Sequence, residues 1–204
     1  MAGAVGRPAR SGMETRETIL DVSLKLFASK GYLGASLSDI VSKVGIAKPS
    51  LFHHFPNKER LYAAVLDRIA DSLIPIVENC ERAEEPEQGL IQTAIDLDIW
   101  CHENPDATCI VMRDMLDMDQ RAAPPKSWPL AIFITAIEDL HKRLPKGSTV
   151  SNLSFQAFLA LYLGSINYMH LSRDTLTGMG KLQSGDFKQS QKELLEILKK
   201  LLNT

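Results

Sequence analysis

The segment Ala35–Leu61 limits what this chain can fold into more than any other, because it predicts short helices in quick succession. Ser36, followed three residues later by Asp39, is a helix start of the capping-box kind. Apolar residues then recur at helical spacing until Gly45, a residue suited to the left-handed conformation that ends many helices. These apolar residues are Leu37, Ile40, Val41 and Val44. A short helix that ends at Gly45 is therefore predicted.

A second short helix is predicted to begin near Lys48, directly after the turn formed by residues 45–47. Pro49 lies in its first turn, where a missing backbone N–H costs nothing. Leu51 and Phe55 lie four residues apart, so both are expected to face the core. Two helices joined by so short a turn must pack against each other, and Ile46 is the apolar residue expected between them.

The second helix leaves six side chains to face outward or sideways. They are Lys48, Pro49, Ser50, Phe52, His53 and His54. A short helix that presents a base, a hydroxyl and two imidazoles suits insertion into the major groove of DNA. The pattern therefore predicts a helix-turn-helix, with double-stranded DNA as its partner.

The charge distribution agrees with this prediction, although the net charge of −2 does not. Residues 1–58 hold 8 basic and 4 acidic side chains, whereas residues 59–204 hold 15 and 21. A basic N-terminal quarter on an acidic remainder fits a DNA-binding head on a body that does not bind DNA.

These residues resemble the tetracycline-repressor (TetR) family. The similarity is carried by the run from Gly45 to Phe55 and by Asn57-Lys58-Glu59-Arg60-Leu61. Upstream, Ile19-Leu20, Leu26-Phe27 and Lys30-Gly31-Tyr32 fit the same pattern. The resemblance covers residues 15 to 65 or so, and the rest of the chain agrees only in length and helical character.

The resemblance implies a role for each matching position. Lys48, Pro49 and Ser50 match positions that meet base edges or the nearby backbone, and His53 and His54 match groove-facing positions. Ser36 and Lys58 match positions that anchor phosphate. Phe52 stands where the family usually has a tyrosine that touches phosphate through its hydroxyl. We therefore expect Phe52 to pack on a thymine methyl or a sugar instead.

The remainder of the chain is predicted to be helical. The expected helices are 14–30, a long one from Lys58, then 87–103, 106–119, 129–143, 152–173 and 186–202. With the two short helices this gives an all-α fold of about nine helices. Pro75 is expected to kink the long helix or to end its regular part. The expected domains are a flexible tail at 1–12, a helix-turn-helix DNA-binding domain at 13–58, and a ligand-binding and dimerisation domain at 59–204.

The last two predicted helices are unusually apolar, which is typical of helices that are buried or shared with a partner. The resemblance implies a homodimer held by a four-helix bundle of these helices, and an internal core is the alternative. The expected interface residues are Phe155, Leu159, Leu163, Ile166, Leu194 and Leu198.

A small-molecule pocket inside the body is also implied by the resemblance. The candidate lining residues are Trp100, Met112, Met115, Trp128, Phe133, Phe158, Tyr162 and Asn167. His102, His141 and His170 are further candidates for polar contacts. The alternative is that these side chains are ordinary core residues. An apolar wall with few charges indicates a hydrophobic or aromatic ligand.

Several other functions lack support. Cys80, Cys101 and Cys109 are sparse and lie in apolar surroundings, which favours reduced cysteines in a cytoplasmic protein. Their spacing from histidines is not that of a metal site, and no acid, base and nucleophile converge, so neither metal, cofactor nor enzymatic activity is expected. No apolar run is long enough to span a bilayer.

The sequence thus predicts a ligand-responsive transcriptional regulator, with a repressor released by a small hydrophobic molecule as the first hypothesis. A helical ligand-binding or interaction protein without specific DNA binding is the alternative.

Overall fold

The computed structural model describes residues 12–116, 131–181, 183 and 186–203, and every regular element in these ranges is a helix. The predicted all-α class is confirmed. The tail predicted at 1–12, apart from Gly12, lies outside the described residues, as does Trp128.

The chain divides into two compact units, residues 1–66 and 67–204. Helix α4 (Lys58–Arg82) contributes residues to both units. The sequence placed the domain boundary after Lys58. The first turns of α4 belong with the N-terminal unit because their apolar side chains, Leu61 and Tyr62 among them, are buried there.

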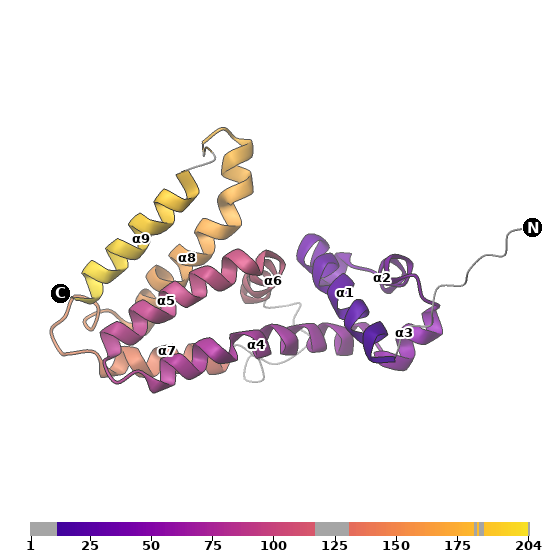
Figure 1. The fold of residues 1–204 in the computed structure, drawn as a ribbon, viewed down its shortest axis with the longest axis horizontal. Helices are drawn as coiled ribbons and strands as arrows, with labels where there is room; N and C mark the ends of the chain where they lie inside the picture. Colours follow the sequence, from indigo (N-terminus) through magenta and orange to yellow (C-terminus); the bar gives the residue numbers. More distant parts are fainter. Residues whose placement is uncertain (1–11, 117–130, 182, 184–185, 204) are drawn as a thin grey trace, which may run out of the picture. The chain divides into compact units, whose positions relative to one another are not determined.

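The N-terminal unit contains α1 (Gly12–Gly34), α2 (Leu37–Val44), α3 (Lys48–His54) and the start of α4, labelled in Figure 1. Gly31 has φ 72°, so the regular part of α1 ends there, as the sequence predicted. Tyr62 of α4 contacts the rings of Phe27 and Tyr32 at 5.0 and 4.9 Å between centroids. The fully buried side chains of this unit include Ile19, Leu26, Phe27, Ile40, Leu51 and Leu61.

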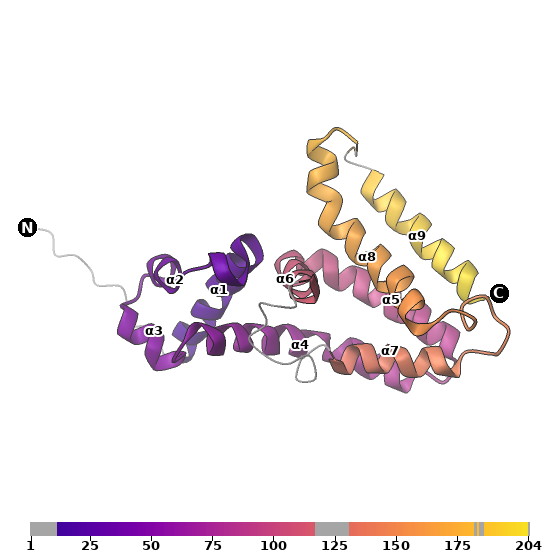
Figure 2. The same cartoon turned by 180° about the vertical axis from the view of Figure 1, so that it is seen from behind.

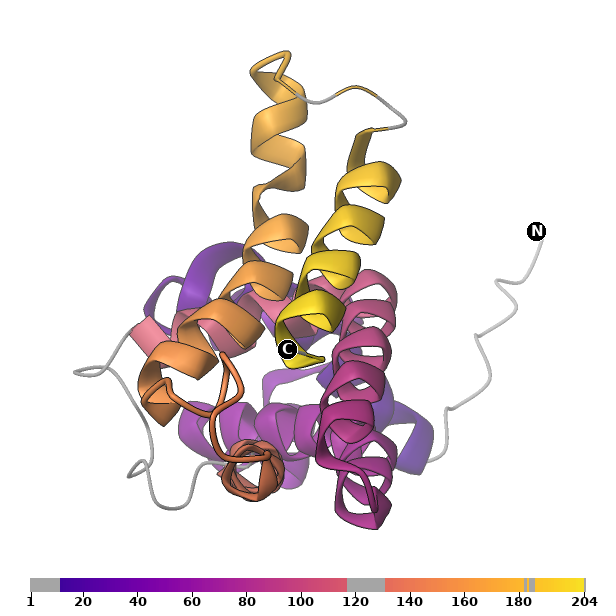
Figure 3. The same cartoon turned by 90° about the vertical axis from the view of Figure 1, so that its left-hand side faces the viewer.

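The second unit contains the rest of α4, α5 (Pro86–Glu103), α6 (Pro105–Leu116), α7 (Ala131–Arg143), α8 (Phe155–Gly178) and α9 (Asp186–Leu202). Helix α5 is central, since α6, α7, α8 and α9 all pack against it (Figure 2). Helices α8 and α9 lie side by side and run in opposite directions (Figure 3).

Where the structure describes them, the predicted ends of the body helices hold to within one residue except in α8. Helix α8 begins at Phe155, three residues later than predicted, and ends at Gly178, five residues beyond the predicted end, because no breaker occurs earlier in the segment. Helix α4 does not end at Pro75 but continues to Arg82. A proline inside a helix costs about 3 kcal/mol. Burial of Leu73, Ile76 and Val77 around it offsets that cost, since each buried aliphatic side chain contributes about 1.5–3 kcal/mol.

Candidate nucleic-acid interface and body cavities

The turn between α2 and α3 forms as the sequence predicted. Ser36 caps α2, and its Oγ accepts a hydrogen bond of 3.0 Å from the Asp39 N–H. Gly45 adopts φ 75° and donates its N–H to the Val41 carbonyl at 3.0 Å. Ala47 caps α3 through its backbone alone, and Pro49 follows in the first turn of that helix. The direction of α3 is therefore set by one left-handed glycine.

Helix α3 has a buried face and an open face. Leu51 is fully buried and Phe55 nearly so, which confirms the predicted core positions. The six residues predicted to face outward include four exposed ones, Lys48, Pro49, Phe52 and His53, and two half-buried ones, Ser50 and His54. Within this face the Lys48 ammonium lies 5.9 Å from the centroid of the Phe52 ring, and the two imidazoles lie 5.5 Å apart.

Lys58 does more in the fold than the sequence indicated. Its Nζ lies 4.6 Å from the centroid of the Tyr32 ring and donates to the Leu33 carbonyl at 3.3 Å. Partial burial lowers the pKa of Lys58. The start of α4 is thereby tied to the end of α1, and Asn57 caps α4 by accepting from the Arg60 N–H at 2.8 Å. Any phosphate contact made by Lys58 would be shared with these internal partners.

A second contact that holds α2 in place was not predicted from the sequence. The Lys30 ammonium binds the Asp39 carboxylate at 2.8 Å, which ties α1 to α2. This hydrogen bond and the lysine charge lower the pKa of Asp39. The ion pair also neutralises the carboxylate beside Ser36, where a bare negative charge would repel phosphate.

Comparison with known proteins agrees with this geometry. Residues 19–65 match the family model described as bacterial regulatory proteins, tetR family. The transcriptional activator FasR of Mycolicibacterium smegmatis is 30% identical over 115 residues, which are 55% of this chain and 52% of FasR. Over residues 19–65 the chain is thus similar to the TetR family. The transcriptional repressor ComR of Escherichia coli is 46% identical to this chain over 56 residues, 28% of the chain and 27% of ComR.

The matches to these curated relatives thus span about half of one and a quarter of the other. The fold as a whole is shared more widely. The solved structure of the transcriptional regulator FadR from Bacillus subtilis, in complex with stearoyl-CoA, has a TM-score of 0.66 at 14% identity. That similarity covers 89% of this chain and 96% of the FadR chain.

The residues predicted to line a ligand pocket lie in different surroundings. Phe158 and Tyr162 are buried and stack on each other at 5.0 Å, and the Tyr162 hydroxyl donates to the Leu90 carbonyl. The Trp100 indole N–H donates to Ser72 Oγ at 3.0 Å. Phe133 lies at an open apolar cavity of about 260 Å³ between α4 and α7. Met112 is half-buried, Met115 is exposed and Asn167 is buried.

The residues predicted to form a dimer interface lie at graded depths on α8 and α9. Ile166 and Leu198 are buried, whereas Phe155, Leu159, Leu163 and Leu194 are half-buried. Four other large apolar side chains on the same helices, which the sequence analysis did not single out, are exposed to solvent. These are Leu161, Tyr168, Leu171 and Ile197.

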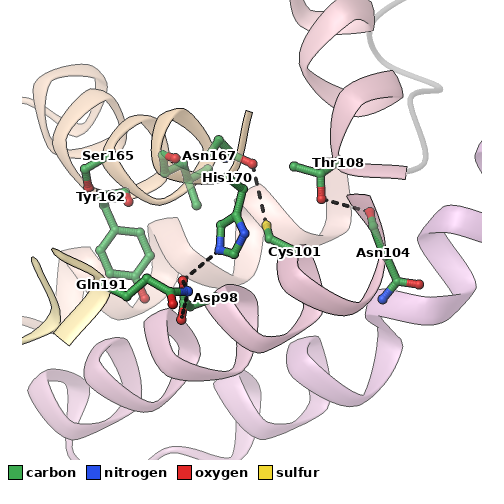
Figure 4. Close-up of polar contacts among 10 residues, drawn as sticks. Asp98, Cys101, Asn104, Thr108, Tyr162, Ser165, Asn167, His170 and Gln191 are labelled. Atoms are coloured by element: carbon green, nitrogen blue, oxygen red, sulfur yellow. Dashed lines mark hydrogen bonds and ion pairs between the residues drawn. The ribbon is translucent and has the colours of Figure 1, made fainter. Parts of the chain in front are cut away.

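A polar cluster joins α5, α8 and α9 inside the body (Figure 4). His170 Nε2 and Asp98 Oδ1 lie 2.8 Å apart, and the two side chains are only 7% and 16% exposed. Gln191 Nε2 donates to both Asp98 oxygens at 2.9 and 3.0 Å. Burial acts to raise the pKa of Asp98, but the hydrogen bonds from His170 and Gln191 outweigh it and hold that pKa below its usual value.

Cys80, Cys101 and Cys109 form no disulfide, and the first two are buried. Burial raises the pKa of Cys101 to about 11, and its Sγ donates to Asn167 Oδ1 at 3.7 Å. No cluster of three or more metal-ligating side chains occurs in the described ranges. In the same ranges, no helix has the length and apolar character needed to cross a membrane.

A second cavity of about 370 Å³ lies among the C-terminal end of α5, the start of α6 and the second half of α8. Its lining differs from the predicted apolar pocket because it is rich in polar groups. It consists of Cys101, His102, Pro105, Asp106, Thr108, Cys109, His170, Leu171, Arg173 and Asp174. Of these, His102 and His170 were among the candidates for polar contacts, and the others were not predicted.

Proposed function

We propose that this chain is a transcriptional regulator that binds a palindromic DNA site as a homodimer and is released from it by a small molecule. The observation that carries the proposal is the open face of α3, where Lys48, Pro49, Phe52 and His53 are exposed on a helix fixed by the Gly45 turn. This is the arrangement with which a recognition helix contacts base edges in the major groove.

Ser36, Ser50, His54 and Lys58 complete the proposed DNA surface. Phosphate contacts position such a reader and base contacts specify its site. Phe52 has no hydroxyl to offer a phosphate, and its ring lies near the Lys48 ammonium. We propose that Phe52 packs on a thymine methyl or sugar and holds Lys48 toward the bases.

A homodimer is proposed because one α3 covers only a few base pairs, and two-fold symmetry doubles the site. The exposed Leu161, Tyr168 and Ile197 on α8 and α9 support this pair of helices as the interface. The predicted interface residues with half-buried side chains, Phe155, Leu159, Leu163 and Leu194, would complete it around Ile166 and Leu198.

A small-molecule effector is supported by the cavity beside Phe133, by the cavity among α5, α6 and α8, and by FadR, whose structure holds stearoyl-CoA. The sign of regulation is proposed to be repression. Both signs occur among similar proteins, since FasR is named an activator and ComR a repressor. The action on DNA would place the protein in the cytoplasm and requires no catalysis.

The decisive experiment selects duplexes from a random library with the full chain at moderate salt and then measures affinity for the enriched sequence and for a scrambled one. We expect an inverted repeat to be enriched. Lys48→Ala should reduce the discrimination between the two duplexes, because a base contact of this kind contributes about 1–3 kcal/mol of it. Equal affinity of the wild type for selected and scrambled DNA would instead support the alternative, a helical binding protein without specific DNA recognition.

A further inference from the structure

The polar cavity among α5, α6 and α8 contains one side chain whose chemistry is fixed by its neighbours. His170 is 7% exposed, and its Nε2 is held 2.8 Å from a buried carboxylate oxygen of Asp98. Asp98 is itself fixed by two hydrogen bonds from Gln191. The ring of His170 is therefore held with Nε2 directed at Asp98, as Figure 4 shows.

The other ring nitrogen, Nδ1, has no hydrogen-bond partner in the part of the chain that the structure describes. In a neutral imidazole that donates Nε2–H to a carboxylate, Nδ1 carries a lone pair and accepts hydrogen bonds. His170 is one of the residues that line the cavity, so an acceptor on its ring that no described protein group satisfies is one that a ligand can satisfy.

The other lining residues indicate that such a ligand should carry a hydrogen-bond donor. Thr108 is 1% exposed and donates its hydroxyl proton to the Asn104 carbonyl at 3.0 Å, so it offers the cavity no donor. Asp106 and Asp174 add carboxylate acceptors at the cavity lining. Pro105 and Leu171 supply apolar contact. The cationic group of the lining, Arg173, lies 4.8 Å from the centroid of the Phe187 ring.

We infer that this cavity binds a small neutral molecule that presents a hydroxyl on an apolar frame, and that His170 Nδ1 accepts the hydroxyl proton. Asp98 is the positioning residue, because it fixes the ring and its tautomer. His102, whose ring lies 6.4 Å from that of His170, is exposed on the same lining but has no part in the proposed contact, so it is the comparison residue for the test below.

The regulatory meaning of this binding rests on the effector role proposed above, but the binding itself can be measured without DNA. It also connects the ligand to α9, since the hydrogen bonds run from His170 to Asp98 and on to Gln191. A ligand on Nδ1 would change the strength of the bond that holds Gln191, and hence the hold on α9.

The test uses the full chain without DNA and a panel of matched probes, each a small phenol or alcohol paired with its methyl ether. Binding is followed by the ring ¹⁵N and ¹³C signals of the histidines. We expect at least one hydroxylated probe to shift the His170 signals and to bind at least tenfold more tightly than its methyl ether. The ¹⁵N signals should also show the Nε2–H tautomer of His170, and Asp98→Asn should change that tautomer.

Three variants separate recognition from structure. His170→Gln should lose the preference for the hydroxylated probe while retaining the wild-type amide spectrum elsewhere in the chain. His102→Gln, which removes an imidazole from the same cavity, should retain the preference. If His170→Gln disturbs the fold, His170→Asn and the tautomer measurement on the wild type take its place.

The inference is overturned if no hydroxylated probe binds, if the methyl ethers bind equally well, or if His102→Gln has the same effect as His170→Gln. The result is distinct from that of the DNA selection. Probe binding without DNA recognition would leave the cavity assignment standing and refute the regulatory role, and the reverse outcome would do the opposite.

Discussion

Lys58 illustrates how one residue can serve both the fold and the proposed contact with DNA. Its ammonium lies against the Tyr32 ring and the Leu33 carbonyl, so it holds α4 to α1 before any DNA is present. A cation–π contact contributes about 0.5–1 kcal/mol at a partly exposed site, and a hydrogen bond about 1 kcal/mol. The sequence indicated the phosphate-anchoring role but gave no sign of this internal one.

Lys58→Ala should therefore lower the free energy of unfolding by about 1–2 kcal/mol and also weaken DNA binding evenly across sequences. Urea titration and the salt dependence of affinity measure the two effects. Lys43→Ala removes an exposed lysine from the end of α2 and is the matched control for stability, with an expected change within about 0.5 kcal/mol. Equal stability of the Lys58 variant and the wild type would contradict the internal role.

Asp98 should make the stability of the second unit depend on pH in the acid range. Because the folded protein holds the pKa of Asp98 below its usual value, the stabilisation is present above the unfolded pKa of about 3.9 and disappears as pH falls through the folded value. The wild type should lose stability between about pH 5 and pH 3. Asp98→Asn should be less stable at neutral pH but should lose less over that acid range. Urea unfolding at a series of pH values measures this, and parallel curves for the two proteins would refute it.

At the scale of the element, helix ends and apolar stripes were predictable because they depend on residues close in sequence. Ser36 and Gly45 act within a turn of where they stand, and their roles at the helix ends came out as predicted. The passage of α4 through Pro75 was not predictable, because it depends on burial against distant segments. The Asp98–His170–Gln191 cluster lay beyond reach for the same reason, since 72 and 93 residues separate its partners.

The candidate DNA site followed the same rule. Its residues lie in one short helix and its flanks, so spacing alone could collect them. The body cavity draws residues from three helices, and spacing identified only its histidines as candidates.

Helix α5 passes so close to its neighbours that Gly89 has no room for a side chain. A Cβ at this position would lie 2.6 Å from the Ala83 Cβ and 3.0 Å from Leu140 Cδ1. Gly89→Ala should therefore destabilise the second unit by about 1–3 kcal/mol, despite the better helix propensity of alanine. Thermal unfolding measures the change.

Gly178→Ala is the control, because a Cβ there meets nothing within 4 Å at the end of α8. Its stability should stay within about 0.5 kcal/mol of the wild type. A Gly89 variant as stable as this control would show that α5 can move aside.

For the whole molecule, the exposed apolar side chains of α8 and α9 should decide the state of association. Leu161→Asp should produce a monomer at micromolar concentrations, because a carboxylate in an apolar interface is desolvated without a partner. Ile132→Asp changes a similarly exposed side chain on α7 and should leave association unchanged. Sedimentation equilibrium distinguishes the two, and a Leu161 variant that associates as the wild type does would exclude this face as the interface.

Gln191 has a consequence for the register in which α9 packs against α5 and α8. The helix repeats leucine at positions 194, 195, 198, 201 and 202, so sliding it by one turn would bury nearly the same apolar surface. Such a slip would also carry the Gln191 amide away from Asp98 and remove two hydrogen bonds from a carboxylate that is only 16% exposed. A single glutamine therefore sets the register of a helix whose leucines alone would accept several, much as one buried polar residue fixes the alignment of a coiled coil.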